Sequence, residues 1–192
     1  MKVHCIFFAI LNGWVKLSHV TQDGEQVVVA MLTKNDTTGE SSIFEKGNFA
    51  SSAQVVENAQ ILSLPLALLK EQMTISNQLA HNMLTTMYQY QRRHEMFLEQ
   101  FMLYSAPQRV GCFILGLCPL NQQIDGVHIH LPYDKSLIAN TLGMRGATFS
   151  RALNMLRDGT GIKIEGNNVT VTSMSRLLEF VNGCYSAHIP RL

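Results

Sequence analysis

The first 70 residues alternate between short hydrophobic runs and polar, turn-like segments, a pattern typical of β-strands. The run 7–20 contains the pair Asn12-Gly13, which predicts a hairpin with its turn at this place. Further predicted strands follow a turn at 22–25, and they occupy residues 26–32, 53–56 and 60–64. Strands this closely spaced predict a small antiparallel β-roll. Because the sequence opens inside a strand-like run, we expect an N-terminal part of the roll to be missing.

Between residues 76 and 105 the hydrophobic period becomes that of a helix. Side chains recur there at alternating spacings of four and three, and they form one predicted face: Met83, Met87, Tyr90, His94, Phe97, Phe101 and Tyr104. A helix of about 45 Å, at about 1.5 Å per residue, is longer than a small roll can cover. Packing on its own domain is one explanation, but we favour a symmetric two-chain coiled coil with this face as the dimer interface. His94 is then expected to be a packed core residue rather than a metal ligand.

Residues 131–157 predict two short helices joined by a sharp turn. The first helix has an apolar stripe formed by Leu137, Ile138 and Leu142, and Gly143 follows as a helix stop. The second helix is expected from about Ala147, and it buries Phe149, Leu153 and Leu156. Residues 161–172 then predict two strands around a Gly-Asn-Asn turn. A helix-turn-helix followed by such a hairpin is a winged helix, whose second helix can enter a DNA major groove.

Composition places the chain among ordinary globular proteins, with 192 residues, 46% of them hydrophobic and 15% charged. No apolar run approaches the roughly 20 residues of a membrane helix, so we expect a cytoplasmic protein without a membrane partner. Residues 105–192 carry eight Lys/Arg against five Asp/Glu, whereas residues 1–104 carry seven against nine. This uneven charge suits DNA binding at the C-terminal end. The expected parts are a β-roll effector domain (1–75), a dimerisation helix (76–106), a winged helix-turn-helix domain (107–180) and a tail (181–192).

The sequence offers little support for a metal centre or an enzyme. The cysteines are scattered without a CxxC pair, so we expect buried, reduced thiols rather than a zinc or iron–sulfur site; they are Cys5, Cys112, Cys118 and Cys184. No nucleophile elbow, P-loop, dinucleotide fingerprint, HExxH motif or paired-carboxylate constellation occurs in the sequence. We therefore predict that the protein is not an enzyme.

A β-roll, a long dimer helix and a winged helix in this order resemble the CRP/FNR family of bacterial transcription regulators. The most specific match is residues 138–153, IANTLGMRGATFSRAL, which are similar to the family's recognition element IA..LG...ET.SR.L. Segments 8–17 and 39–47 resemble its roll strand and roll turn. The resemblance implies an α+β fold, a homodimer, a palindromic site on double-stranded DNA and contact with RNA polymerase. Segment 52–59 is most similar to the haem-associated, nitric-oxide-responsive branch that regulates denitrification.

The resemblance also implies an effector pocket, formed by Gly39, Glu40, Ser51 and Ser52. Members that bind cyclic AMP place an arginine and a serine after the roll turn, whereas residues 48–52 here contain no cation. A phosphodiester would lack a bidentate guanidinium partner, so we expect cyclic AMP not to bind. An iron–sulfur cluster is not expected either. Haem suits a roll rich in Phe, Met and Leu, and each of its candidate axial ligands also has a structural explanation; these are His4, His19, His81 and His94.

On the recognition helix, the glutamate usual in the family is replaced by Ala147, which cannot accept a hydrogen bond from cytosine. By the resemblance, Arg151 is expected to pair with a guanine, and Thr148 and Ser150 to contact bases or phosphates. Phosphate contacts that position the protein are expected from Tyr133, Lys135 and Arg145. The alternative is an effector-binding dimer whose winged helix contacts another protein, and the missing glutamate leaves this open.

Overall fold

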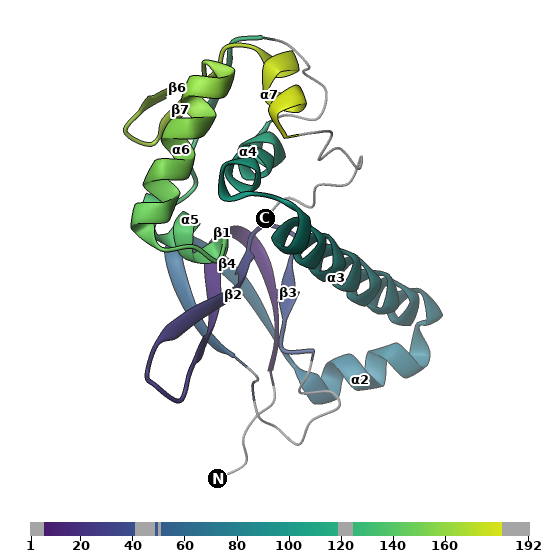
Figure 1. Ribbon diagram of the computed structural model, residues 1–192. Helices are drawn as coiled ribbons and strands as arrows, with labels where there is room; N and C mark the ends of the chain where they lie inside the picture. The colour runs from purple at the N-terminus through teal and green to yellow at the C-terminus, as the bar shows by residue number, and fades with distance from the viewer. Residues whose placement is uncertain (1–5, 41–48, 50, 119–124, 182–192) are drawn as a thin grey trace. The chain divides into compact units, whose positions relative to one another are not determined.

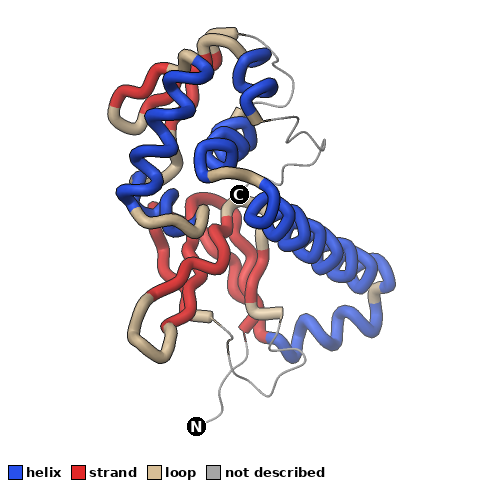
Figure 2. Tube along the Cα trace, viewed as in Figure 1, coloured by secondary structure: helices blue, strands red, loops and turns tan. Residues whose placement is uncertain are grey.

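The computed structural model describes residues 6–40, 49, 51–118 and 125–181. The chain folds into two compact units, Met1–Gln91 and Arg92–Leu192. The division falls inside the long helix α3 (Asn77–Leu103), so each unit contains part of this helix. Figures 1 and 2 show the strands that build the first unit and the mainly helical second unit. The predicted α+β fold class is confirmed.

One antiparallel sheet organises the first unit around the long strand β1 (Ile6–Val20). β1 pairs antiparallel with each of the other strands of this sheet, which are β2 (Gln26–Leu32), β3 (Thr37–Thr38) and β4 (Ser52–Pro65). The predicted strand at 26–32 is confirmed. Helix α2 (Leu66–Ile75), which we did not predict, follows β4 directly and precedes α3.

The predicted hairpin at Asn12-Gly13 is wrong, because β1 continues through this pair without reversing. The pairing with β4 instead shifts register over the same stretch, as it does at β-bulges. Gly13 has a φ of +84°, and a Cβ there would lie 2.3 Å from the carbonyl oxygen of Asn58. The glycine therefore permits a close approach of two strands rather than a reversal of the chain.

Among the described residues of the first unit, buried side chains form two clusters. One lies within the sheet and consists of Ile10, Val15 and Leu32. The other joins the start of β1 to both helices and consists of Phe7, Leu66, Leu69 and Met83. Burying a large apolar side chain contributes about 1.5–3 kcal/mol, so the second group holds α2 and the first turns of α3 against the strand.

Some residues of the predicted seam of α3 pack within their own unit, and others are exposed. Met83 is buried in the core just described, and Tyr90 is half-buried and hydrogen-bonded to Thr37 of β3. Tyr104 is also half-buried, whereas the remaining members of the seam are exposed: Met87, His94, Phe97 and Phe101. The interface prediction is therefore wrong for Met83 and Tyr90, because the sheet of their own unit occupies that side of the helix.

The second unit continues from α3 into a winged helix. Its elements are α4 (Ala106–Leu117), β5 (Val127–His130), α5 (Lys135–Thr141), α6 (Gly146–Thr160), β6 (Lys163–Glu165), β7 (Asn168–Val171) and α7 (Met174–Phe180). The strands form an antiparallel sheet in the order β5-β7-β6. This confirms the predicted helix-turn-helix and its hairpin wing, with Phe149, Leu153 and Leu156 buried as expected.

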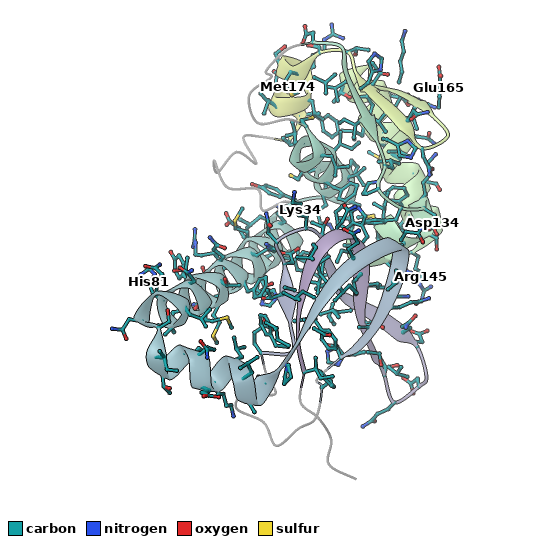
Figure 3. The ribbon with its side chains drawn as sticks, turned by 180° about the vertical axis from the view of Figure 1, so that it is seen from behind. Lys34, His81, Asp134, Arg145, Glu165 and Met174 are labelled. Atoms are coloured by element: carbon teal, nitrogen blue, oxygen red, sulfur yellow. The ribbon has the colours of Figure 1, made fainter. Side chains whose placement is uncertain are left out.

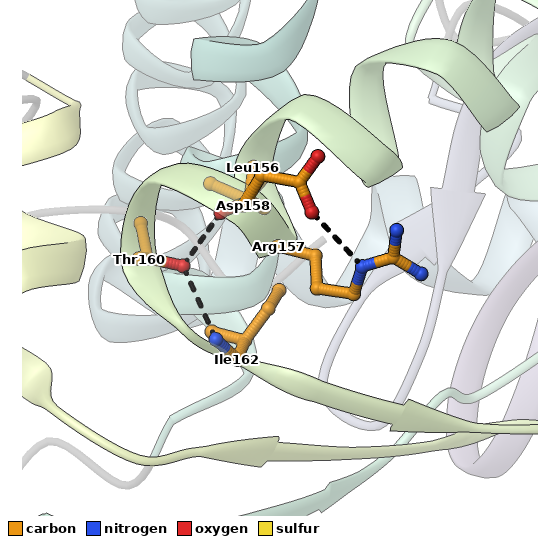
Figure 4. Close-up of polar contacts among 5 residues, drawn as sticks. All are labelled: Leu156, Arg157, Asp158, Thr160 and Ile162. Carbon is orange, nitrogen blue, oxygen red and sulfur yellow. Dashed lines mark hydrogen bonds and ion pairs between the residues drawn. The ribbon is translucent and has the colours of Figure 1, made fainter.

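Local sequence explains where the helices of this unit begin and end. Ser105 and Gln108 form a capping box at the start of α4, and Pro107 occupies its first turn, where a missing N–H costs nothing. At the other end of α6, the buried Thr160 hydroxyl donates to the carbonyl of Leu156 at 2.7 Å and accepts from the amide of Ile162 at 3.4 Å. These bonds, drawn in Figure 4, join the end of the recognition helix to Ile162, the residue that precedes the first wing strand.

Candidate nucleic-acid interface

The turn between α5 and α6 sets the direction of the recognition helix. Asp134 caps α5, and its carboxylate accepts a hydrogen bond from the Leu137 amide at 2.8 Å. The amide of Met144 donates to the carbonyl of Ala139 at 2.9 Å and closes the turn. Gly143 has a φ of +63°, which a glycine adopts without steric cost. Figure 3 marks Asp134 and Arg145, which immediately precede the two helices.

Helix α6 has one buried face and one exposed face. The buried face consists of Phe149, Ala152, Leu153 and Leu156. The exposed residues on the first turns are Arg145, Gly146, Ala147, Ser150, Arg151 and Asn154. Of the other predicted DNA contacts, Thr148 and Lys135 are half-buried. The fold therefore leaves polar and cationic side chains at the start of the helix without a role in the core, as a groove-reading helix requires.

Arg151 lies on the exposed face of α6, and its guanidinium bonds to the backbone one turn earlier in the same helix. Its Nε donates to the carbonyl oxygen of Ala147 at 3.3 Å. The guanidinium has five N–H donors in all, so the terminal nitrogens can still approach a guanine edge. The methyl group of Ala147 adds no hydrogen bond at the position where the family has glutamate.

Asn154 is an exposed residue of α6 that we did not predict as a site residue. It follows Ser150 by four residues and Arg151 by three, so the three side chains share one side of the helix. Asparagine can pair bidentately with adenine in the major groove. The helical spacing from Arg151 is the sequence feature that could have identified it.

Tyr133 does not lie where the predicted phosphate contact needs it. The side chain is 5% exposed, and its ring packs against Phe113 with 6.4 Å between the centroids. Burial raises the pKa of Tyr133 to about 12, although a hydrogen bond with Thr141 acts in the opposite direction. The prediction is wrong because the hydroxyl lies inside the domain, where it cannot reach a phosphate.

The predicted effector residues belong to the first unit, and one of them is connected to α3. The Tyr90 hydroxyl donates to the carbonyl of Thr37 at 2.9 Å and accepts from the amide of the same residue at 2.5 Å. The Thr37 hydroxyl in turn donates to the carboxylate of Glu40. Burial raises the pKa of Tyr90 above its usual value, although the bonds to Thr37 partly offset this. A continuous polar network therefore runs from α3 through β3 to Glu40.

The other predicted effector residues are more dispersed. Gly39 precedes Glu40, the Ser51 hydroxyl lies 3.2 Å from Nε2 of His19, and Ser52 is exposed at the start of β4. Ala50 and residues 41–48 lie outside the described residues. In sequence, residues 48–52 contain no lysine or arginine that could pair with a cyclic phosphate.

The described ranges contain no group of three or more His, Cys, Asp or Glu side chains placed to hold a metal ion. His19, His81 and His94 are exposed, so they do not provide a buried axial ligand for haem, and His4 lies outside the described residues. No described helix is long and apolar enough to cross a membrane.

Two cysteines of α4 and its C-cap behave differently. Cys112 is disulfide-bonded, so the prediction of reduced thiols is wrong for this residue, because spacing along the chain does not reveal which cysteines meet. Cys118 is free, and burial raises the pKa of its thiol to about 11. Neither residue takes part in the interface described above.

Two family models match the chain, one in each part of the sequence. A cyclic nucleotide-binding domain matches residues 3–75, and a Crp-like helix-turn-helix domain matches residues 108–180. The chain belongs to the CRP/FNR family of transcription regulators. The predicted regulator function is thereby confirmed at the level of the family, while the haem-associated branch stays a prediction.

Relatives and solved structures agree with this assignment. The chain is 28% identical over 171 residues to the global nitrogen regulator of Synechococcus elongatus, covering 85% of this chain and 76% of the relative. It is 24% identical over 172 residues to the CRP-like cAMP-activated global transcriptional regulator of Mycobacterium tuberculosis, covering 88% and 77%. The structure of FixK2 from Bradyrhizobium japonicum superimposes with a TM-score of 0.75 at 20% identity, covering 93% and 88%. At that identity the structure supports the fold alone.

Proposed function

We propose that the protein is a homodimeric regulator that binds a palindromic DNA site through α6 in response to an effector held by the roll. The exposed start of α6 carries this proposal, because its polar and cationic side chains serve no purpose in the core. Arg151 pairs with a guanine, while Thr148, Ser150 and Asn154 contact neighbouring bases or phosphates. Lys135 and Arg145 bind phosphates and position the domain without reading sequence.

The dimer forms along an exposed apolar face of α3, next to the face that the roll covers. Its residues are each at least 40% exposed, and they are Leu84, Met87, Tyr88, Leu98, Phe101 and Met102. Their spacing follows a coiled-coil heptad, and a large exposed apolar patch typically marks an interface. Two-fold pairing of such helices places two copies of α6 in successive major grooves, about 34 Å apart. The DNA site is therefore an inverted repeat.

The effector is a small molecule that donates hydrogen bonds to the network of Glu40, Thr37 and Tyr90. Carboxylate and hydroxyl oxygens suit hydroxyl or amine donors, whereas a carboxylate and a cyclic phosphate carry the same sign of charge and repel each other. Cyclic AMP, named for the mycobacterial relative, is for these reasons not the ligand we propose. Haem is the specific alternative from sequence, and an absorption spectrum of the protein with added haem, with and without nitric oxide, tests it directly.

Selection of binding sites from random duplexes tests the proposal as a whole. We expect an inverted repeat with half-site centres about one helical turn apart, and a dimer mass by sedimentation. The position that the family's glutamate reads should be poorly constrained because of Ala147. Recovery of no palindrome by a protein that is a dimer would contradict the proposal.

The second candidate is a dimer whose winged helix contacts another protein. Gly146 and Ala147 favour it, because these two exposed positions in the first turn of α6 carry no hydrogen-bonding side chain. A dimer that selects no DNA sequence would support this candidate. In the leading proposal the protein acts in the cytoplasm and contacts RNA polymerase at the promoter, which transcription from a selected site with purified polymerase would test.

A further inference from the structure

Three segments of the second unit meet at the helix-turn-helix turn. The guanidinium carbon of Arg109, on α4, lies 4.7 Å from the ring centroid of Phe101, near the end of α3. Nη1 of the same arginine donates to the carbonyl oxygen of Leu142 at 3.1 Å. Leu142 is the C-cap of α5. One side chain therefore joins the end of α3 to the residue at which the turn begins.

Gly143 makes a second contact with the same ring. A Cβ built on Gly143 would lie 2.9 Å from Cε2 of Phe101, so the turn backbone rests directly on the aromatic ring. Phe101 also stacks with Phe97 at a centroid distance of 6.4 Å. The ring thus contacts the guanidinium, the turn and a second ring, so a shift of Phe101 would change its contacts with all three.

Arg109 is half-buried rather than exposed like the arginines of α6. Its Nε is shielded from solvent without a hydrogen-bond partner, and burial lowers the pKa of its guanidinium. Burying a cation has a free-energy cost unless its contacts offset it. The contacts with the ring and with the Leu142 carbonyl supply that compensation.

We propose that Arg109 is a positioning residue for DNA recognition: it fixes the turn between α5 and α6, and so the direction of α6, against the last turns of α3. Arg109 does not itself touch DNA. The proposal rests on the function proposed above, because it explains how α6 keeps its direction for reading a groove.

The same geometry links assembly to recognition. Phe97 and Phe101 are 40% and 53% exposed, and Phe101 belongs to the apolar face proposed for the dimer. A second copy packed over these rings would restrict Phe101 and, through Arg109, the turn. Because binding linkage is reciprocal, DNA that selects the ordered turn should also strengthen the dimer.

Arg109→Lys is the most direct test. Lysine keeps the charge but lacks the planar guanidinium, which can stack on a ring and donate a hydrogen bond to a carbonyl at the same time. Arg176→Lys, on the exposed surface of α7, is the matched control. Hydrogen exchange should become about tenfold faster in peptides covering 137–149, where turn amides are hydrogen-bonded, and stay unchanged in the wing at 163–171. Phe101→Leu, which keeps an apolar side chain, should loosen the same peptides.

Unchanged exchange at 137–149 in both variants would overturn the proposal, as would equal acceleration in the wing. This measurement requires only folded protein, so it is decisive even if the chain reads no DNA. With a selected DNA site, Arg109→Lys should weaken specific binding about tenfold, because the direction of α6 is lost, while binding to random duplex changes by less than about twofold. Parallel losses on both DNAs would instead mean that Arg109 contacts phosphate, and would overturn its positioning role. Failure of the wild type to select DNA would count against the proposed function alone.

Discussion

The two halves of α3 are fixed to their units by different chemistry. In the first unit, a neutral hydroxyl of Tyr90 bonds to the backbone of Thr37, and Met83, about two turns earlier on α3, is buried in the core. In the second, the ring of Phe101 packs under the charged guanidinium of Arg109, which bonds to a turn carbonyl. A hydroxyl keeps its role only while it is protonated, whereas a guanidinium keeps its charge but depends on the geometry of its fork.

The difference indicates how one helix can serve two units and still present an interface. In the first half, the attached face includes Met83 and Tyr90, and neighbouring positions leave Leu84 and Met87 exposed. In the second half, Phe101 belongs to both the attached face and the exposed face, because its ring contacts Arg109 while 53% of the residue stays exposed. Only the second half therefore offers a direct connection between a partner copy and the DNA-reading turn.

The largest expected effect is on the oligomeric state, and it distinguishes the exposed face of α3 from the face attached to the first unit. Leu98→Asp places two carboxylates at the proposed interface, and the protein should sediment as a monomer with its fold intact. Met83→Ala, on the attached face, should retain the dimer but lower the free energy of unfolding by about 2–5 kcal/mol. Sedimentation and urea unfolding of both variants distinguish these outcomes. If the Leu98→Asp protein remained a dimer, the exposed face of α3 would not be the dimer interface.

The next largest effect concerns the DNA-reading side chains. Arg151→Ala should cost about 1–3 kcal/mol per half-site and relax preference at one base pair, because its guanine contact is lost. Lys135→Ala should weaken all sequences alike and make the salt dependence shallower. Titrations of matched and substituted duplexes at several salt concentrations measure both effects. If Arg151→Ala weakened every duplex equally, its assignment as a base reader would be wrong.

The sequence predicted the helix-turn-helix of the second unit more accurately than the roll of the first, and particular residues show why. Around Gly143 the helical stripes, the glycine and the hairpin are local features, so the helix-turn-helix follows from neighbouring residues. At Gly13 the decisive fact is the approach of Asn58, which lies far along the chain. A heptad pattern likewise cannot distinguish a face covered by its own sheet from one that awaits a partner, which is why Met83 and Tyr90 were misassigned. Asn154 could have been found by spacing alone.

A smaller effect on stability is expected when the hydrogen bonds between Tyr90 of α3 and Thr37 of β3 are removed. Tyr90→Phe removes the hydroxyl that bonds to both the amide and the carbonyl of Thr37, so these half-buried backbone groups lose a hydrogen-bond partner. The free energy of unfolding should fall by about 1–3 kcal/mol. Thr86→Val, a half-buried position one turn earlier on α3, is a control that removes a hydroxyl bonded only within the helix. Equal losses in the two variants would contradict a specific attachment through Tyr90.

The smallest effect at neutral pH is expected from Tyr133→Phe, which tests the corrected position of this residue. Because the hydroxyl is buried, the variant should bind DNA within about twofold of the wild type, unlike the loss that a phosphate contact would produce. The pKa of Tyr133 is about 12 in the folded protein, against about 10 for an unfolded tyrosine.

Since the folded pKa lies above the unfolded one, the contribution of this phenol is fully present below about pH 10 and is lost as the pH rises toward 12. The wild type should therefore lose about 2–3 kcal/mol more stability than the variant across that interval. Urea unfolding at pH 8, 10 and 11.5 provides the comparison, and groups common to both proteins cancel in the difference. Parallel pH profiles for the two proteins, or a tenfold loss of DNA affinity at pH 7.5, would mean that the phenol reaches solvent after all.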